Sequence, residues 1–588
     1  MLHRVKYSFI LCFILSSYTF SQSVGSLQIK GGKNFTEEEI IAWSNVKKGD
    51  KFYPGLIDSI KSRLALQFGN YGYFHSSFEK TRISFTPDSR HLNLEITVDE
   101  GEPTYIKKIF YSGLDSLSST NIIPFFGFME GSIFNKYDLE ENISKSLSYF
   151  ENNGYPFAKI KVSSVYFYSD SANGEYFAEL HLNFSREILS KIDRVEINGN
   201  ASTKDYVILR ELQIRPGEEY SQETIDGFAA KLNRLGFFDP VGAPDFFIDS
   251  KNEGVLRINV KEKITNSFDG IVGYVPGTGS NQSGYLTGLV NVSMKNLFGT
   301  GRAASINWQQ YSQSSQDLEL KYLEPWLFNY PFNFTADLFQ RKQDSTYIQR
   351  KFEGSIEYLA SDNLSAAFTF STELVIPSQA DSLVFTVFNS GSVSTGFNVK
   401  VDTRDDPYSP TRGLLFITSY SFSRKKIYGP QQFITSGIST NENLQRFTLD
   451  LDLFYKLFNR QIAALGVHGR ELQASFYEAS DLFRLGGANS LRGYLEDQFL
   501  GNRVAWTNFE YRLLLTNRTF GFLFFDTGYY LRSAEPLSNI ETTEGFKLGY
   551  GLGFNVETSL GVLKVSFALA QGDTFANGKI HFGIVDEF

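Results

Sequence analysis

The sequence predicts a multidomain chain in which three small α+β domains, each with the element order β-α-α-β-β, precede a closed antiparallel transmembrane β-barrel of about 16 strands. Two patterns carry this prediction. Glycines recur at nearly constant intervals through the first half, whereas apolar and polar side chains alternate through the second half. The composition agrees with both patterns, because 16% of the 588 residues are aromatic and 49 are glycine, a mixture typical of strands joined by glycine-bearing turns.

Residues 1–21 have the pattern of a secretory signal peptide. Arg4 and Lys6 precede a short apolar run, and small polar residues lead to an expected cleavage after Ser21. A membrane-anchor helix is the alternative, but the apolar run is far shorter than a bilayer span. Cys12 is the only cysteine, so we expect a mature chain without disulfides or thiolate ligands.

The first half contains three units marked by equivalent glycines. Gly31, Gly113 and Gly199 each follow a short β-like segment. Gly49, Gly131 and Gly217 each lie in a turn between two helical patterns. Gly72, Gly154 and Gly236 each precede an aromatic residue and follow one another at a spacing of 82 residues. Ile225 and Phe228 lie at helical spacing before the last of these glycines, and strand-like runs close each unit. We therefore expect domains over residues 24–101, 102–187 and 188–264. The alternative is three unrelated α/β domains.

Residues 265–588 follow a two-residue alternation instead of a helical spacing. Phe447 and Leu449 fall on one face of an expected strand, while Thr448 and Asp450 fall on the other. Strands that are apolar outside and small or polar inside are typical of a membrane barrel, and about 20 residues per strand and loop give about 16 strands. Lipid requires such a sheet to close. A large soluble β-sandwich is the alternative.

The three units resemble POTRA domains, the polypeptide-transport-associated modules of outer-membrane assembly proteins. The third unit carries the resemblance best, in IDRVEINGNASTKDYVILREL (192–212), RPGEEYS (215–221) and LNRLGFF (232–238), and the first ends in VDEGEPTYI (98–106). A small sheet covered by two helices leaves an edge strand to which an extended client segment can pair with little sequence demand. The alternative is that these domains are spacers.

A second resemblance lies in the expected barrel, where FRLGG (483–487) precedes SLRGY (490–494). These strings resemble the conserved inner loop of the BamA and TamA families and of two-partner secretion transporters. The resemblance implies that a tip folds back inside the barrel, and the tip residues are Leu491, Arg492, Gly493 and Tyr494. Weaker similarities to the same families occur in NLFGTGR (296–302) and YLEPW (322–326).

An arginine at such a tip implies an acidic partner on the inner wall of the barrel. NFEYR (508–512) and FFDTG (524–528) resemble the two wall strands of the family. We expect Arg492 to pair with Asp526, with Glu510 as the second choice, because a planar guanidinium matches a carboxylate. The alternative is a solvated arginine in an ordinary surface loop.

The end of the chain resembles the terminal strand of outer-membrane barrels. Phe582, Ile584 and Phe588 carry this signal, whereas Asp586 departs from the apolar pattern. In the resembling families, a weak seam between the first and last strands admits client strands. Asp586 is consistent with a frayed last strand and equally with a C-terminus that passes the membrane edge.

No motif in the sequence indicates catalysis. The histidines show no metal-ligand spacing, and neither a phosphate-loop pattern nor a G-x-S-x-G elbow occurs. We therefore expect no enzyme activity, no cofactor and no metal. The formal net charge of −9 argues against a nucleic-acid partner, which would require a basic surface.

The resemblance implies a location in the outer membrane of a Gram-negative bacterium, with the repeats in the periplasm. The expected role is the capture of unfolded barrel proteins by the repeats and their insertion through the barrel. Membrane lipids and periplasmic or inner-membrane assembly proteins are further expected partners. Three repeats make the chain more similar in size to TamA than to BamA. A dedicated two-partner-type secretion transporter, a passive channel and a periplasmic binding scaffold are the alternatives.

Overall fold

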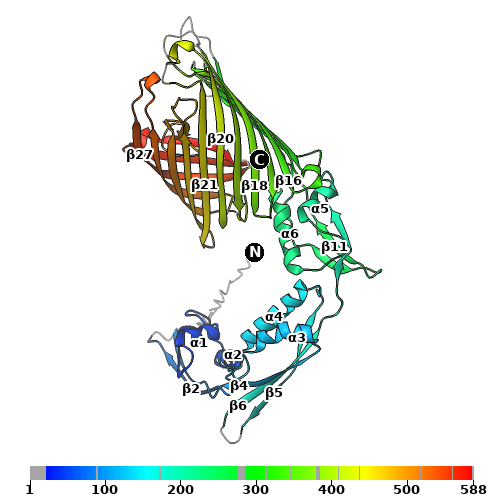
Figure 1. The fold of residues 1–588 in the computed structure, drawn as a ribbon. Helices are drawn as coiled ribbons and strands as arrows, with labels where there is room; N and C mark the ends of the chain where they lie inside the picture. Colours follow the sequence, from blue (N-terminus) through cyan, green and yellow to red (C-terminus); the bar gives the residue numbers. More distant parts are fainter. Residues whose placement is uncertain are drawn as a thin grey trace, which may run out of the picture. The chain divides into compact units, whose positions relative to one another are not determined.

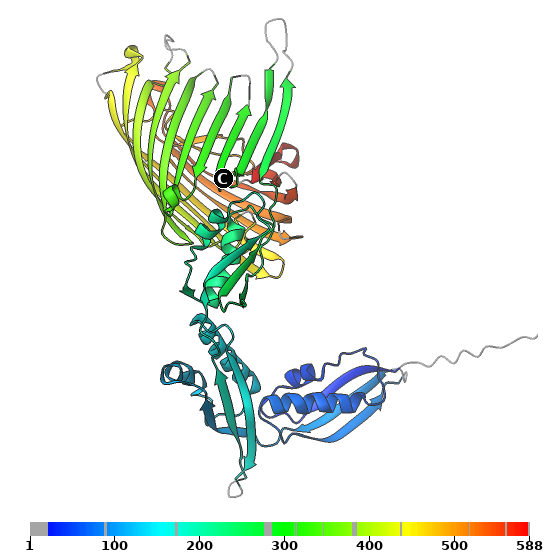
Figure 2. The same ribbon diagram turned by 90° about the vertical axis from the view of Figure 1, so that its right-hand side faces the viewer.

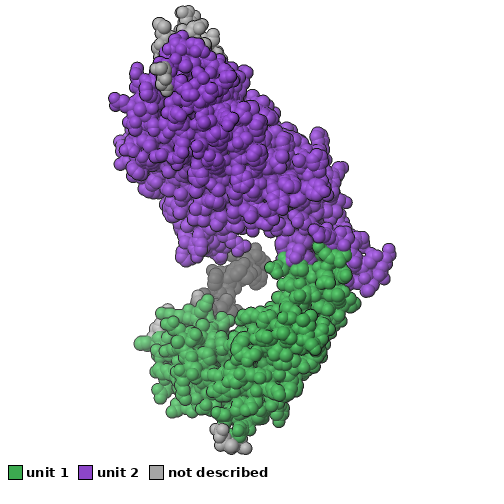
Figure 3. Space-filling model, in the orientation of Figure 1, with its two compact units in different colours: residues 1–192, 217–223 green, residues 193–216, 224–588 purple. Residues whose placement is uncertain are grey.

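The computed structural model describes residues 22–87, 91–170, 174–275, 285–310, 312, 314–344, 346–378, 385–407, 409–435, 438–516, 518–558 and 561–585. The expected signal peptide (1–21) and the terminal residues Asp586 and Phe588 lie outside the described residues. The chain divides into two compact units, residues 1–192 with 217–223 and residues 193–216 with 224–588 (Figure 3). The first unit holds two repeats, and the second holds most of the third repeat together with the barrel.

The first two repeats each form a three-stranded sheet covered by two helices. The first consists of β1 (Ser23–Lys30), α1 (Glu37–Ser44), α2 (Leu56–Asn70), β2 (Ser77–Phe85) and β3 (His91–Asp99). The second consists of β4 (Thr104–Ser112), α3 (Ser116–Phe126), α4 (Lys136–Asn152), β5 (Lys159–Ser169) and β6 (Tyr176–Ser185). In both repeats the last strand is central, pairing in parallel with the first strand and antiparallel with the second. The predicted order β-α-α-β-β is confirmed.

The helices of the repeats bury one face because their apolar residues recur every three or four positions. In α2, Ile60, Leu64 and Phe68 are fully buried in a core that includes Leu94 and Ile96 of β3. At about 1.5–3 kcal/mol for each fully buried large apolar side chain, this face holds the helix on the sheet. In the part of the chain that the structure describes, no helix is both long enough and apolar enough to cross a bilayer.

The third repeat has the same order in β8 (Arg194–Asn198), α5 (Asp205–Leu212), α6 (Gln222–Arg234), β10 (Asp245–Ile248) and β11 (Gly254–Asn259), with an added pair of β7 (Lys191–Ile192) and β9 (Glu218–Glu219). One glycine set has the same surroundings in all three repeats. A Cβ atom at Gly31, Gly113 or Gly199 would lie 2.1, 2.0 or 1.9 Å from a carbonyl oxygen at the end of the last strand. Because φ is also positive at these positions, glycine is required there.

The rest of the chain forms a 16-stranded antiparallel sheet that curves into a barrel (Figures 1 and 2). Its strands, in chain and sheet order, are β12 (Asn266–Val275), β13 (Tyr285–Leu297), β14 (Arg302–Gln310), β15 (Gln316–Glu324), β16 (Phe332–Gln343), β17 (Tyr347–Leu359), β18 (Leu364–Pro377), β19 (Asn389–Asp402), β20 (Gly413–Gly429), β21 (Asn441–Phe458), β22 (Gln461–Gln473), β25 (Arg503–Leu514), β26 (Phe520–Arg532), β27 (Thr543–Thr558), β28 (Gly561–Ala570) and β29 (Lys579–Val585). Among the described strand residues, β12 and β29 each pair with a single neighbour. The predicted number of antiparallel strands is confirmed.

Apolar side chains cover the outside of the barrel. Phe546, Leu552 and Phe554 of β27 are exposed on one face of their strand, and the alternation directs the intervening Gly551 and Gly553 to the interior. Exposed aromatic and aliphatic side chains on most strands of such a sheet require a lipid environment, because water would leave this surface unfavourably hydrated.

Strand β26 departs from the expectation that inner side chains are small or polar. Phe520, Phe522 and Phe524 are buried on its inner face, while Leu523 and Phe525 are exposed on its outer face. The neighbouring strand makes this possible. Phe522 and Phe524 pair directly with Gly553 and Gly551 of β27, whose missing side chains leave space for the rings.

Candidate functional site

A hairpin inside the barrel carries the expected loop tip. Strands β23 (Phe483–Leu485) and β24 (Phe499–Gly501) pair with each other and form a separate two-stranded sheet between β22 and β25. Residues 486–498 form the tip region between them. Gly486 and Gly487 begin this region with φ angles of 122° and 98°, a conformation that allows the chain to turn sharply after β23.

Arg492 forms the buried centre of the tip, with 2% of its surface exposed. Its Nε and Nη2 atoms each donate a 2.7 Å hydrogen bond to a different carboxylate oxygen of Asp526 on β26. Its Nη1 atom donates to Glu510 on β25 at 2.6 Å, and its backbone N–H donates to Asp526 at 3.1 Å. The structure therefore brings Arg492 against both of the acids that the sequence analysis named.

Glu510 is shared among three cations. Besides the Arg492 contact, it accepts hydrogen bonds from Arg512 Nε at 2.9 Å and from Lys564 Nζ at 3.0 Å. Glu510 and Asp526 are 5% and 0% exposed. Buried charges are costly unless they are paired and hydrogen-bonded, so movement of the loop away from the wall would leave both carboxylates with fewer partners. The contacts therefore favour the observed position of the loop.

An aromatic ring and two glycines complete the binding site of the Arg492 side chain and backbone. The guanidinium carbon of Arg492 lies 3.7 Å from the ring centroid of Phe524, within the range of a cation–π interaction. Gly551 faces Phe524, and a Cβ atom there would lie 2.8 Å from the ring. Gly549 faces the tip, and a Cβ atom there would lie 1.9 Å from the carbonyl oxygen of Arg492. The glycines of β27 therefore allow the tip to approach the wall.

The residues beside Arg492 extend the contact over several strands. Leu491 is fully buried, and its side chain occupies the space above Gly528 of β26. Tyr494 donates a 3.1 Å hydrogen bond to the carbonyl oxygen of Leu548 in β27. Gly493 has a φ angle of 94°, and a Cβ atom on it would lie 2.8 Å from the backbone of β28. All four tip residues thus touch the inner wall.

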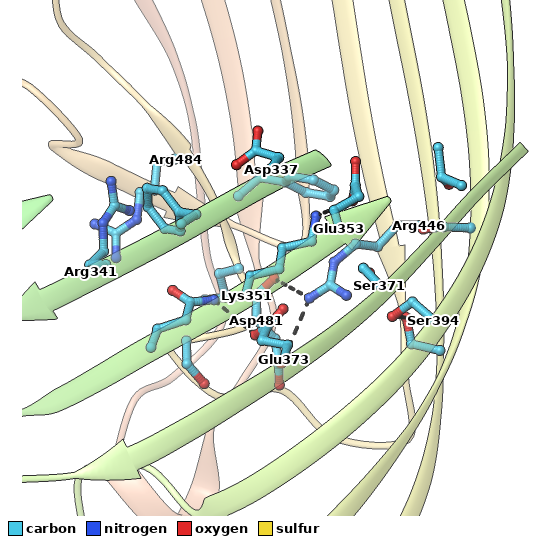
Figure 4. A pocket seen from close by; sticks show the side chains of 18 of the residues that line it. Asp337, Arg341, Lys351, Glu353, Ser371, Glu373, Ser394, Arg446, Asp481 and Arg484 are labelled. Atoms are coloured by element: carbon cyan, nitrogen blue, oxygen red, sulfur yellow. Dashed lines mark hydrogen bonds and ion pairs between the residues drawn. The ribbon is translucent and has the colours of Figure 1, made fainter. Parts of the chain in front are cut away.

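A polar cavity of about 440 Å³ lies inside the barrel beside the base of the hairpin (Figure 4). Its wall carries charged side chains of both signs, such as Lys351, which pairs with Glu353 at 2.6 Å. Arg484 of β23 borders the cavity, donates to Asp497 at 3.1 Å within the hairpin, and donates to Tyr347 of β17 at 2.9 Å. The hairpin base is therefore also bound to β17, a strand that does not belong to the β25–β29 segment contacted by the tip.

The sequence analysis gave no role to several residues of the site. Lys564 and Phe524 contribute charge and ring contacts, and Gly549 provides space. The alternation of glycines along residues 549–553 was a usable signal for Gly549, because small inner residues permit close approach. Lys564 carried no signal, since it reaches Glu510 across 54 residues of chain.

The remaining expected residues lie away from this site. Phe582 is exposed on the outer face of β29, and Ile584 is part of the same strand. The expected turn glycines of the repeats all have positive φ angles, namely Gly31, Gly113, Gly199, Gly72, Gly154 and Gly236. Among the described residues, no group of three or more histidine, cysteine or acidic side chains could hold a metal ion.

Comparison with known families gives two matches. Residues 296–588 match the family described as the Omp85 superfamily domain. Residues 22–101, 104–177 and 190–263 match the family described as the surface antigen variable number repeat, also called POTRA.

Comparison with individual proteins agrees with these families. The chain is 23% identical to the outer membrane protein assembly factor BamA of Nitratidesulfovibrio vulgaris, over 87% of this chain and 65% of the relative, and 21% identical to BamA of Neisseria meningitidis, over 82% and 63%. It therefore matches less than two thirds of the length of these relatives. Among solved structures, CdiB from Escherichia coli has a TM-score of 0.50 at 13% identity, over 82% of this chain and 89% of that one, which shows a shared fold.

Proposed function

Because the chain belongs to the Omp85 superfamily, we propose that it assembles proteins into the outer membrane of a Gram-negative bacterium, with its repeats in the periplasm. In this proposal the repeats receive unfolded barrel proteins and the barrel inserts them among the membrane lipids. The relatives named BamA, an outer membrane protein assembly factor, support this assignment. The role is one of binding and templating and is not enzymatic.

The observation that carries the proposal is the hairpin fixed inside the barrel by Arg492. A buried group of five charges and the contacts beside it hold this loop against five neighbouring strands, β25–β29. A loop fixed on strands β25–β29 stabilises one end of the sheet, where the last strand has one pairing neighbour among the described residues. An edge of this kind can accept the strand of another protein by backbone hydrogen bonding.

The second repeat offers a suitable surface for the first contact with a client. In its sheet β6 is central, so β5 has one pairing neighbour among the described strands. Val162 and Tyr166 of β5 are exposed beside this free flank, with 42% and 61% of their surface accessible. We propose that an extended client segment pairs along β5, where backbone hydrogen bonds supply affinity and the exposed apolar side chains add contact area.

A photo-crosslinking amino acid at position 166 tests client capture directly. Reaction with unfolded barrel proteins is expected from this position. The matched control is position 117 on α3 of the same repeat, whose side chain is 73% exposed but lies on a helix without a free strand flank. Equal crosslinking from both positions would contradict pairing along β5.

Controlled depletion of the protein followed by quantitative proteomics of the outer membrane tests the function as a whole. A fall in many unrelated barrel proteins supports a general assembly factor. Loss of one secreted product alone would instead identify a dedicated secretion transporter and would overturn the proposal. Periplasmic or inner-membrane assembly partners would be recovered by crosslinking to the repeats in the same cells.

A further inference from the structure

The tip of the inner hairpin also contacts the last strand of the barrel. The backbone N–H of Gly493 donates a 3.1 Å hydrogen bond to Nε2 of His581 on β29. β29 occupies one end of the 16-stranded sheet and pairs with β28 along seven residues. This contact therefore joins the hairpin, which Arg492 fixes on β25 and β26, to the strand that lies at the sheet edge.

The register of the last strands explains why His581 faces the tip. His581 pairs directly with Ser566 of β28, whose side chain is buried on the inner face, while Ile580 and Phe582 on either side of His581 are 62% and 67% exposed. The imidazole therefore points into the barrel. Ser566 and Ala568 are small, so the inner wall is shallow here and leaves room for the backbone of the tip.

The contact has a defined chemistry. An amide N–H is a donor, so Nε2 must present its lone pair and the ring must be neutral with its proton on Nδ1. The bond is made by the tip backbone, and any side chain at position 493 would meet the backbone of β28. A substitution on the strand side is therefore the cleaner way to remove the contact.

We propose that His581 is a positioning residue that couples the hairpin tip to the edge strand, so that the pairing of β29 and the pose of the hairpin change together. Because β29 has one pairing neighbour among the described residues, a contact with the fixed tip adds a second point of support. That this coupling controls the entry of client strands at β29 rests on the proposed function, whereas the coupling between the hairpin and β29 does not.

Two substitutions separate positioning from simple space filling. In His581→Gln, the side-chain oxygen can accept the Gly493 N–H at a reach similar to that of Nε2. In His581→Leu, the volume is similar but the acceptor is lost. Phe582→Leu is the matched control, because it alters the same strand on its outer face and leaves the tip contact intact.

Hydrogen–deuterium exchange of the purified full chain in phospholipid nanodiscs, without any client, tests the coupling. His581→Leu is expected to raise exchange in residues 579–585 and 486–498 together, by about fivefold, the factor that corresponds to one ordinary hydrogen bond. His581→Gln and Phe582→Leu should stay close to the unmodified protein in residues 486–498.

Two results would overturn the proposal: faster exchange of residues 579–585 alone in His581→Leu, or equal behaviour of the Leu and Gln variants. Faster exchange across the whole barrel in His581→Leu would mark that variant as misfolded. The test would then be the exchange of residues 486–498 in His581→Gln compared with the unmodified protein. Faster exchange there in His581→Gln would contradict the assigned acceptor. Since no client is present, the outcome does not depend on whether the protein assembles other proteins.

Discussion

The guanidinium of Arg492 and the carboxylate of Asp526 form two parallel hydrogen bonds of 2.7 Å inside the barrel. Both side chains are almost completely buried, and the same guanidinium reaches Glu510 with its third nitrogen. A planar cation that is bonded on two edges and stacked on Phe524 cannot be replaced by a point charge without loss of contacts.

Arg492→Ala is expected to release the hairpin tip and to reduce assembly of barrel proteins into liposomes at least tenfold. Removal of one partner leaves Asp526 and Glu510 as buried charges with fewer cations, which costs about 3–5 kcal/mol. Arg492→Lys should recover part of the activity. The repeats should remain folded in both variants.

The control for Arg492→Ala is Arg503→Ala, which removes an exposed ion pair between Arg503 of β25 and Glu471 of β22. Exposed pairs contribute about 0–1 kcal/mol, so this variant should assemble clients at close to the normal rate. Normal assembly by Arg492→Ala would exclude the tip from the mechanism.

Gly549→Ala is expected to displace the tip while every charged residue remains. The added Cβ atom would lie 1.9 Å from the carbonyl oxygen of Arg492, so the hairpin must move at a cost of about 1–3 kcal/mol. In Gly549→Ala, hydrogen exchange of residues 486–498 is expected to be faster than in the unmodified protein. Gly469→Ala on β22 is the control, because a Cβ atom at that position meets no atom within 4 Å. Equal exchange in the two variants would refute the close approach.

The strands of the barrel could be predicted from the sequence because lipid on one side and a polar interior on the other impose a period of two. Residues 447–455 and 546–556 show this period, and they lie within β21 and β27. The repeats could be predicted because glycine is required at equivalent turns. In the candidate site, the family motif pointed to Arg492 and two acids, which the structure places in contact.

Other features could not be predicted because they depend on neighbours that are distant in the chain. Alternation shows which residues of β26 share a face, but the inward direction of Phe522 and Phe524 depends on glycines of β27 that make room for the rings. The contact of His581 with the tip likewise depends on the register of β28 and β29. No local pattern encodes such a register.

Lys425→Met is expected to loosen residues 474–482, the segment that connects β22 to the hairpin. Lys425 of β20 is buried and pairs with both Glu478 and Asp481, at 2.7 Å for the aspartate, while Glu478 also accepts the backbone N–H of Phe388. Without the lysine two carboxylates remain in a buried site, which costs about 3–5 kcal/mol. Thermal unfolding and hydrogen exchange of residues 474–482 measure the effect.

A double variant sharpens the test of this cluster. Lys425→Met combined with Glu478→Gln should recover much of the lost stability, because one uncompensated charge is removed together with its partner. The control is Lys426→Met, which changes the adjacent, exposed lysine of β20. A double variant as unstable as the single one would show that the ion pairs do not hold residues 474–482 in place.

Glu211 of the third repeat and Trp326 of the barrel are joined by a hydrogen bond that we expect to depend on pH. Trp326 Nε1 donates a 2.6 Å hydrogen bond to Glu211 of α5, and burial raises the pKa of the Glu211 carboxyl. Arg210, Lys231 and Asp362 are the other charged groups around it. When the third repeat is docked on the barrel, the Glu211 carboxyl therefore keeps its proton up to a higher pH than when the repeat is undocked. Docking is therefore strongest at acidic pH and weakens as the pH rises from the ordinary carboxyl pKa to the raised one.

Glu211→Gln is expected to remove this pH dependence, because the amide oxygen still accepts from Trp326 and carries no charge. Hydrogen exchange of residues 205–212, corrected for the intrinsic effect of pH, should be slower at acidic than at neutral pH in the unmodified protein and equal at both in the Gln variant. Trp326→Phe leaves the carboxylate without its donor and should speed exchange at neutral pH. Glu219→Gln, an exposed carboxylate in the same repeat, should leave the pH profile unchanged. A profile that persists in Glu211→Gln would assign the pH response to another group.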